Sequence, residues 1–183
     1  MATALVLIDV INDFFDPVGR NYHPSYEPIL ANIRRVLAAA RRGGIAVIHC
    51  MEGHRPGVDF EHRKLPVHCI VGEHDAEPAQ GIEILDGEVV VRKRRYSAFF
   101  GTDLDLVLRE RGIDRLLIVG VKSHVCIRAT IQDAFGSGYE ALLVRDCTGS
   151  NRPHLHEASL EDIERYMGRV ISLAETLSLL GEA

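Results

Sequence analysis

The chain contains no tryptophan, and aromatic residues make up only 6% of its 183 positions. A surface that stacks nucleic-acid bases needs such rings, and the formal net charge of −5 also disfavours contact with phosphates. No apolar run approaches the roughly 20 residues of a membrane span, and the first residues lack the basic start and cleavage site of a signal peptide. We therefore expect a cytoplasmic protein that binds neither nucleic acid nor a membrane.

Cysteine pairs at metal-binding spacing are absent as well. The four cysteines, Cys50, Cys69, Cys126 and Cys147, form no C-x-x-C motif. This spacing argues against a zinc knuckle and against a thioredoxin-type dithiol. We expect all of them to be reduced thiols, with at least one that is reactive.

The composition, with 46% hydrophobic and 26% charged residues, is that of an ordinary globular protein. The sequence has no internal repeat, linker or low-complexity tract. A chain of this length buries roughly 70% of its unfolded surface on folding. We therefore expect a single domain that spans residues 1–183.

Short apolar runs alternate with amphipathic segments. The runs predict strands at Ala4–Val10, Ile45–Cys50, Glu88–Arg92, Arg115–Val121, Glu140–Asp146 and Arg169–Leu173. The segments between them predict helices at Pro28–Arg42, Asp103–Arg111, His124–Gly138, Leu160–Met167 and Ala174–Leu180. This alternation implies an α/β fold of three layers, with a six-stranded, mostly parallel sheet and helices on both faces. The polar residues 51–87 predict a long irregular loop of the kind that is often functional.

The pattern also predicts how two of the helices are built. In the 124–138 helix, the apolar residues, Phe135 among them, are expected to face the core. Ser159 is expected to cap the 160–167 helix, with Asp162 three residues later completing a weak capping box.

Three chemically active side chains follow predicted strands. In parallel sheets ligands bind beyond the carboxyl ends of the strands, which directs attention to Asp9, Lys93 and Cys126. Cys126 stands at the start of a predicted helix, where a thiolate has a lowered pKa and free backbone N–H groups can hold an oxyanion. The carboxylate of Asp9 fits a helix cap, a salt-bridge partner or a catalytic base, and Asp13 is equally acidic.

Together the three side chains are sufficient for acyl transfer. The carboxylate takes the thiol proton, the ammonium stabilises the anion, and the sulfur attacks a carbonyl carbon. The alternatives are a buried structural thiol at Cys126 and a solvated turn for the basic cluster Arg92–Arg95.

Three segments resemble the isochorismatase-like cysteine hydrolases, in order and at the spacing of that family. They are LVLIDVINDFF (Leu5–Phe15), KRRYSAFFGTDLDLVLRERGID (Lys93–Asp114) and GVKSHVCIRATIQDAFGSGYEALLVRD (Gly120–Asp146). The family includes nicotinamidases, N-carbamoylsarcosine amidase, and ureidoacrylate and biuret amidohydrolases, and it has a Rossmann-like fold. Lys122 departs from the Ala or Thr that the family commonly has at that position, which leaves the substrate open.

The resemblance implies a triad in which Asp9 is the general base, Cys126 the nucleophile and Lys93 their electrostatic partner. It also implies a cis peptide between Val121 and Lys122, which aims the backbone N–H groups of Lys122 and Cys126 into an oxyanion hole. By position, the candidates for lining the substrate pocket are Asn12, Phe14, Tyr96 and His124.

The implied activity is hydrolysis of a C–N bond in a small amide, carbamoyl or ureido compound, through a thioester acyl-enzyme that releases ammonia or an amine. No cofactor is required, and the resemblance implies a homo-oligomer. Isochorismatases, which hydrolyse a vinyl ether, are the alternative within the family. They often carry a histidine where His124 stands, but they usually lack the cysteine that is present here. The non-enzymatic alternatives are a redox sensor and a partner-binding protein.

A metal site is the remaining alternative. Glu52, His54 and His68 resemble the Asp-x-His pair and the later histidine through which nicotinamidases bind a metal, and such ligands suit zinc. Glutamate replaces aspartate here, and its additional methylene is expected to displace the carboxylate. We therefore expect no bound metal, and a nicotinamidase activity only if one is present.

Overall fold

The computed structural model describes residues 1–182 as a three-layer α/β fold. Six strands form one sheet in the order β3-β2-β1-β4-β5-β6, and all neighbouring pairs are parallel. The strands are β1 (Ala2–Ile8), β2 (Ala46–Glu52), β3 (Val89–Lys93), β4 (Ile113–Val121), β5 (Glu140–Gly149) and β6 (Arg169–Ile171). The predicted strands are confirmed, with ends shifted by a few residues, and the sheet is fully rather than mostly parallel.

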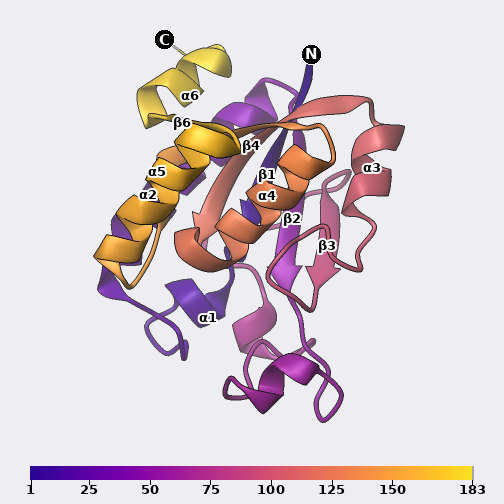
Figure 1. Ribbon diagram of the computed structural model, residues 1–183, viewed down its shortest axis with the longest axis vertical. Helices are drawn as coiled ribbons and strands as arrows, with labels where there is room; N and C mark the ends of the chain where they lie inside the picture. The colour runs from indigo at the N-terminus through magenta and orange to yellow at the C-terminus, as the bar shows by residue number, and fades with distance from the viewer. Residues whose placement is uncertain (183) are drawn as a thin grey trace.

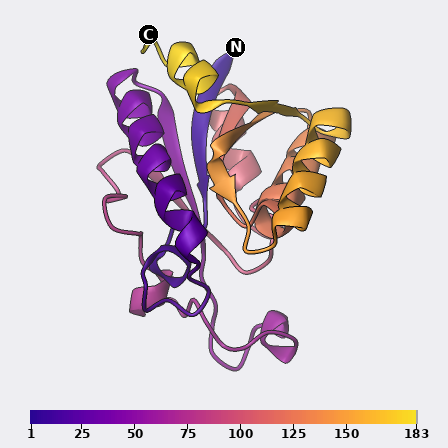
Figure 2. The ribbon, with the colours of Figure 1, turned by 90° about the vertical axis from the view of Figure 1, so that its left-hand side faces the viewer.

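Helices cover both faces of this sheet (Figures 1 and 2). They are α1 (Asn12–Phe15), α2 (Glu27–Arg42), α3 (Leu104–Glu110), α4 (Arg128–Gly136), α5 (Pro153–Tyr166) and α6 (Leu173–Leu179). The apolar side chains of α2 and α6 belong to the core on one face, and those of α3, α4 and α5 to the core on the other. Within residues 1–182, none of these helices combines the length and the apolar character that crossing a membrane requires.

Strand β1 shows why the central strands are apolar throughout. Its side chains alternate between the two faces, so that Leu5 and Leu7 pack in the α2 core, whereas Val6 and Ile8 pack in the α4 core. All four side chains are buried. The buried part of this strand, Ala4 to Ile8, therefore has no polar position, and Asp9 directly follows it.

The strand order places a crossover point between β1 and β4. The chain proceeds from β1 to β2 and β3 on one side of β1, and from β4 to β5 and β6 on the other. Gly120 of β4 lies opposite Ile8 of β1 in the sheet and has a φ of 119°. A Cβ at this position would lie 1.9 Å from the carbonyl oxygen of Ile8. Only glycine permits this approach, and ligand sites in open parallel sheets lie at such crossover points.

The long segment between β2 and β3 lies at the carboxyl ends of the strands, at the lower end of the view in Figure 1. It carries two short 3₁₀ helices, η2 (Phe60–Arg63) and η3 (His74–Ala76). The expectation of an irregular loop is confirmed, although its first two residues, Met51 and Glu52, belong to β2.

Two predictions about helices are wrong. The 124–138 segment is not one helix, because a π-helical turn, η4 (Ser123–Ile127), precedes α4. The change of pitch turns Phe135 outward, and 58% of its surface is exposed. Ser159 is not a cap, since α5 already begins at Pro153, a residue suited to a first helical turn. The Ser159 hydroxyl instead donates a hydrogen bond back to the carbonyl of Leu155 at 2.7 Å.

Candidate active site

Three different strands bring Asp9, Lys93 and Cys126 to one point. Asp9 directly follows β1 with a φ of 52°, Lys93 is the last residue of β3, and Cys126 lies in η4 after β4. Asp9 and Lys93 are fully buried, and Cys126 exposes 5% of its surface. Aspartate tolerates a left-handed backbone better than most residues, which allows the chain to turn sharply at the end of β1.

The Lys93 ammonium joins the carboxylate to the thiol. Its Nζ lies 2.8 Å from Asp9 Oδ2 and 3.5 Å from Cys126 Sγ, and it also donates to the carbonyl of Arg95 at 3.3 Å. The second carboxylate oxygen, Asp9 Oδ1, accepts a hydrogen bond from the backbone N–H of Glu52 at 2.8 Å. The structure thus brings together the carboxylate, the ammonium and the thiol that the sequence indicated.

Burial is the largest influence on the pKa of each of these groups. It raises the pKa of Asp9 to about 6, although the neighbouring Lys93 ammonium opposes the change. Burial alone would lower the pKa of Lys93, but the Asp9 carboxylate and the Cys126 sulfur raise it well above its usual range. The pKa of the Cys126 thiol is also raised by burial, which outweighs the attraction of Lys93. The lowered thiol pKa expected from the helix start is therefore wrong, and the resting site holds a thiol beside a carboxylate.

The backbone between β4 and α4 turns sharply at Cys126. The peptide bond between Val121 and Lys122 is cis, as the resemblance implied. The carbonyl of Lys122 then accepts hydrogen bonds from the N–H groups of Val125 at 3.0 Å and Ile127 at 3.3 Å. These bonds hold the turn that carries Cys126.

A cavity of about 260 Å³ opens beside Cys126. Three of the four predicted pocket residues, Phe14, Tyr96 and His124, line it. The fourth, Asn12, does not, because its amide donates to the carbonyl of His74 at 3.0 Å. The remaining lining residues are Arg20, Asn21, Glu52, Glu61, Leu65, Pro66, His68, Lys122 and Val125.

Most of the lining residues that sequence reasoning missed come from loops and short 3₁₀ segments. Arg20 and Asn21 follow α1, while Glu61, Leu65 and Pro66 lie in the segment between β2 and β3. Loops lack the periodicity that assigns a side to each residue, so nothing in their sequence shows which side chains face inward. The acidic pattern around Asp13 was the one usable signal, since Asp13 anchors Asn21 through a 2.7 Å hydrogen bond.

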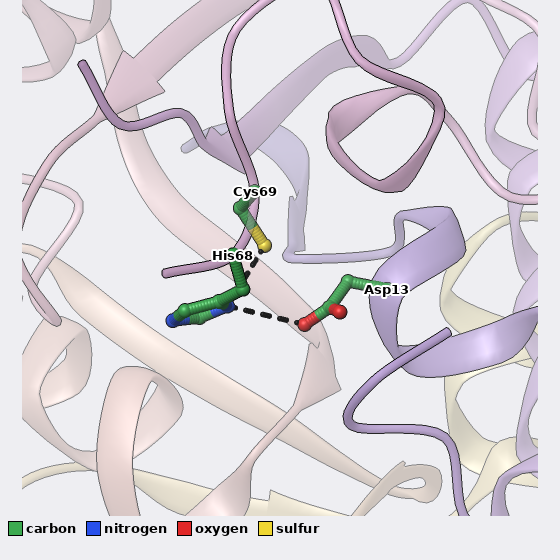
Figure 3. Close-up of side chains that lie close together, drawn as sticks. All are labelled: Asp13, His68 and Cys69. Atoms are coloured by element: carbon green, nitrogen blue, oxygen red, sulfur yellow. Dashed lines mark hydrogen bonds and ion pairs between the residues drawn. The ribbon is translucent and has the colours of Figure 1, made fainter. Parts of the chain in front are cut away.

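Asp13, His68 and Cys69 form a second buried cluster (Figure 3). His68 Nδ1 lies 3.2 Å from Asp13 Oδ2 and 3.2 Å from Cys69 Sγ. Burial raises the pKa of the Cys69 thiol far above its usual value, and Cys69, unlike Cys126, does not line the cavity. Asp13 instead orients the imidazole, and Figure 3 shows the other ring nitrogen of His68 turned away from both partners.

The third candidate cluster contains Glu52 and His54. Glu52 Oε1 lies 2.9 Å from His54 Nε2, and His54 Nδ1 lies 3.1 Å from Asp59 Oδ2. Ligand atoms of Glu52, His54 and His68 all lie within 4.8 Å of one another. The ring of His62 stands 4.6 Å from that of His54, and its two nitrogens are buried without a hydrogen-bond partner among residues 1–182.

This donor set fits a divalent metal such as zinc. It combines a carboxylate with imidazoles, and carboxylates of Asp59 and Asp13 hold the Nδ1 atoms of His54 and His68. The additional methylene of glutamate does not keep the carboxylate away from the imidazole, because Glu52 Oε1 lies 2.9 Å from His54 Nε2. The expectation that no metal is bound stays a prediction.

Comparison with known proteins places the chain among hydrolases. A model of the isochorismatase domain matches residues 3–175. The chain is 30% identical to the ureidoacrylate amidohydrolase of Methylobacterium radiotolerans, over 98% of this chain and 80% of that protein. It is 31% identical to the maleamate amidohydrolase of Pseudomonas putida, over 97% of this chain and 86% of that protein.

The fold gives the same result. The crystal structure of an isochorismatase-like hydrolase from Alkaliphilus metalliredigens superposes with a TM-score of 0.92 at 30% identity, and the match covers 98% of this chain and 99% of that one. The resemblance noted in the three sequence segments is thus confirmed over nearly the whole chain. Its relatives at about this identity are amidohydrolases, and the chain itself belongs to the isochorismatase family.

Proposed function

We propose that this chain is a cysteine-dependent amidohydrolase that cleaves a C–N bond in a small amide, carbamoyl or ureido compound. The observation that supports this proposal most is the position of Lys93 Nζ, which lies 2.8 Å from Asp9 Oδ2 and 3.5 Å from the sulfur of Cys126, a residue that lines the cavity. The names of the two relatives, ureidoacrylate and maleamate amidohydrolase, support the same class of reaction.

In the first half of the proposed reaction, Asp9 accepts the thiol proton while Cys126 Sγ attacks the carbonyl carbon. The backbone N–H groups of Lys122 and Cys126 donate hydrogen bonds to the oxygen that becomes negative. The C–N bond then breaks, the nitrogen takes the proton from Asp9, and ammonia or an amine leaves. The Lys93 ammonium remains charged and stabilises the anion on either partner.

In the second half, a water molecule enters and Asp9 accepts one of its protons. The water oxygen attacks the thioester carbon, the C–S bond breaks, and the sulfur recovers the proton from Asp9. The products are a carboxylic acid, or a carbamic acid from a ureido compound, and the free thiol. This cycle uses only residues of the chain.

A metal held by Glu52, His54 and His68 would act as a Lewis acid toward a substrate heteroatom on that side of the cavity. The chain prepares this side by burying Glu52 and by fixing each imidazole with a carboxylate. Bond cleavage as proposed requires no metal.

An ammonia-release screen over small amides, carbamoyl and ureido compounds tests the proposal. We expect turnover by the wild type, and its near-complete loss in Cys126→Ala and in Cys126→Ser, because a hydroxyl lacks the acidity that a carboxylate base can exploit. Cys50→Ala is the matched control, since Cys50 is also buried but does not line the cavity. Turnover of the Cys126→Ala variant at the wild-type rate would exclude the proposal.

A further inference from the structure

The side chain of Lys122 reaches the cavity beside the nucleophile. Its ammonium donates a hydrogen bond to Asn21 Oδ1 at 3.0 Å and lies 5.4 Å from the centre of the Phe14 ring. An ammonium group has three N–H donors, so two remain for a ligand after the bond to Asn21. Lys122 and Cys126 belong to the same turn between β4 and α4, and both line the cavity.

A chain of hydrogen bonds holds this ammonium in place. Asn21 Nδ2 donates to Asp13 Oδ2 at 2.7 Å, and Asp13 is fully buried. This bond fixes the orientation of the Asn21 amide, so that its oxygen faces Lys122. The backbone N–H of Arg20 donates to Asp13 Oδ1 at 3.1 Å, which ties a second cationic residue of the lining to the same anchor.

The charge of this part of the lining is not balanced by the protein. Within residues 1–182, neither Lys122 nor Arg20 has a carboxylate oxygen within the 4.0 Å of an ion pair. Lys93, by contrast, is paired with Asp9. A pre-oriented cation that faces a cavity without a partner favours an anionic ligand.

Acidic groups elsewhere in the lining restrict where such an anion fits. Glu52 and Glu61 also face the cavity, and the carboxylate oxygens of Glu61 are buried without a hydrogen-bond partner among residues 1–182. These two carboxylates repel the carboxylate of a ligand, but they accept hydrogen bonds from N–H groups such as those of amides and ureas. The lining therefore has separate places for a carboxylate and for N–H donors.

We propose that Lys122, assisted by Arg20, binds a carboxylate that the substrate carries in addition to its scissile bond. The substrate class is then a compact amide acid or ureido acid, because the cavity holds about 260 Å³ and Lys122 lies in the same turn as Cys126. The role of the scissile bond in this inference rests on the proposed amidohydrolase function, whereas the anion subsite rests on geometry alone.

The turnover test compares succinamate, which carries a carboxylate, with succinamide, its uncharged isostere. We expect the wild type to favour succinamate in kcat/KM, and Lys122→Met to lower that preference by about tenfold or more, as for loss of a charge-assisted hydrogen bond. Because the comparison is a ratio within one variant, any general damage to the site cancels. Lys122→Arg should restore most of the preference.

Arg111→Met is the matched control, since it removes the same charge from an exposed residue just before β4, at the opposite edge of the sheet. We expect it to retain the wild-type preference. A preference for succinamate that is the same in the wild type and in Lys122→Met would overturn the inference while leaving the amidohydrolase function intact.

Calorimetric binding of succinate, which needs no turnover, separates the two proposals. We expect succinate to bind the wild type and Arg111→Met, and to bind Lys122→Met about tenfold more weakly or worse. Succinate binding that depends on Lys122, without turnover of any amide, would support the anion subsite and contradict the amidohydrolase function. Equal binding of succinate by the wild type and Lys122→Met would refute the subsite.

Discussion

Lys93 is a fully buried cation in the centre of the site, with a carboxylate and a sulfur as its neighbours. Burying an unpaired charge would cost several kcal/mol, so the Asp9 carboxylate is required for the lysine to remain charged. The same ion pair places a carboxylate near Cys126, which can accept the thiol proton. Burial, opposed in part by the Lys93 ammonium, and not a helix start alone, therefore sets the pKa of the Cys126 thiol.

The histidine cluster gives a prediction at the level of single side chains. We expect metal-free protein to take up about one equivalent of zinc, and His54→Ala to lose this capacity, because Glu52, His54 and His68 supply the donors. His49→Ala is the matched control, since His49 pairs with Glu88 outside the site. Elemental analysis after dialysis measures the uptake, and analysis of the protein as purified tests the expectation that no metal is bound beforehand.

Equal zinc uptake by the wild type and by His54→Ala would contradict this donor assignment. Ammonia release by chelator-treated protein is the companion measurement. It should persist, because the proposed bond cleavage depends on Asp9, Lys93 and Cys126.

At the residue scale, the sequence predicted the residues of the triad better than the residues that line the pocket. Asp9 and Cys126 follow strands and Lys93 ends one, and strand ends of a parallel sheet meet at one edge. Asn21 lies in a turn and Glu61 in the single turn of η2, and both are too short for a period to reveal the direction of a side chain. The raised thiol pKa was missed for a different reason, since burial depends on packing that the sequence does not show.

The close approach of β1 and β4 at Ile8 and Gly120 gives a prediction at the level of elements. We expect Gly120→Ala to destabilise the fold by about 3 kcal/mol or more, because its Cβ would overlap the Ile8 carbonyl oxygen and its φ is positive. Gly112→Ala is the matched control, with a φ of 62° but nothing within 4 Å of the added Cβ. It should cost only about 1 kcal/mol. Urea unfolding measures the stability of both variants. Equal losses of the free energy of unfolding would contradict a steric role for the contact between Gly120 and Ile8.

Strand β3 is joined to its neighbours by a carboxylate just before its first residue. Glu88 lies 2.7 Å from Arg41 Nε of α2 and 2.8 Å from His49 Nε2 of β2. Burial alone would raise the pKa of Glu88, but these donors and the N–H of Leu85 lower it to about 2. The carboxylate thus remains charged in the folded protein at pH values where the unfolded chain is already protonated.

The stability that Glu88 contributes should therefore be present above pH 4.5 and be lost as the pH falls toward 2. We expect Glu88→Gln to lower the free energy of unfolding by about 2 kcal/mol at pH 7. The difference from the wild type should shrink through this acidic window. Urea unfolding between pH 7 and pH 2 measures it, and a difference that does not change with pH would contradict the ion-pair account.

At the element scale, the sequence predicted strands better than helix starts. The strands β1, β2 and β4 each contain a short, nearly continuous apolar run, which few other arrangements produce. The sequence carries no periodic signal for the π turn before α4. The prediction that Phe135 faces the core was therefore wrong, and its side chain points to solvent. The start of α5 was missed because its first turn is polar and only Pro153 marks it.

For the whole molecule, the topology brings distant residues to one place. The two halves of the sheet meet where β1 pairs with β4, and the cavity lies at the carboxyl end of that seam, beside Cys126. The segment between β2 and β3 covers this end from below (Figure 1). The fold class and the identity of the strand ends followed from the sequence, whereas the closure of the site by loops required the structure.

The central claim is that the chain forms a thioester on Cys126. Its most direct test is mass spectrometry of acid-quenched protein, taken during turnover of the best amide or ureido substrate from the ammonia-release screen. We predict an added acyl mass on the peptide that contains Cys126, absent from Cys126→Ala and strongly reduced in Asp9→Asn, which lacks the base. Turnover without any adduct on Cys126, or an adduct that forms equally in Asp9→Asn, would contradict the account.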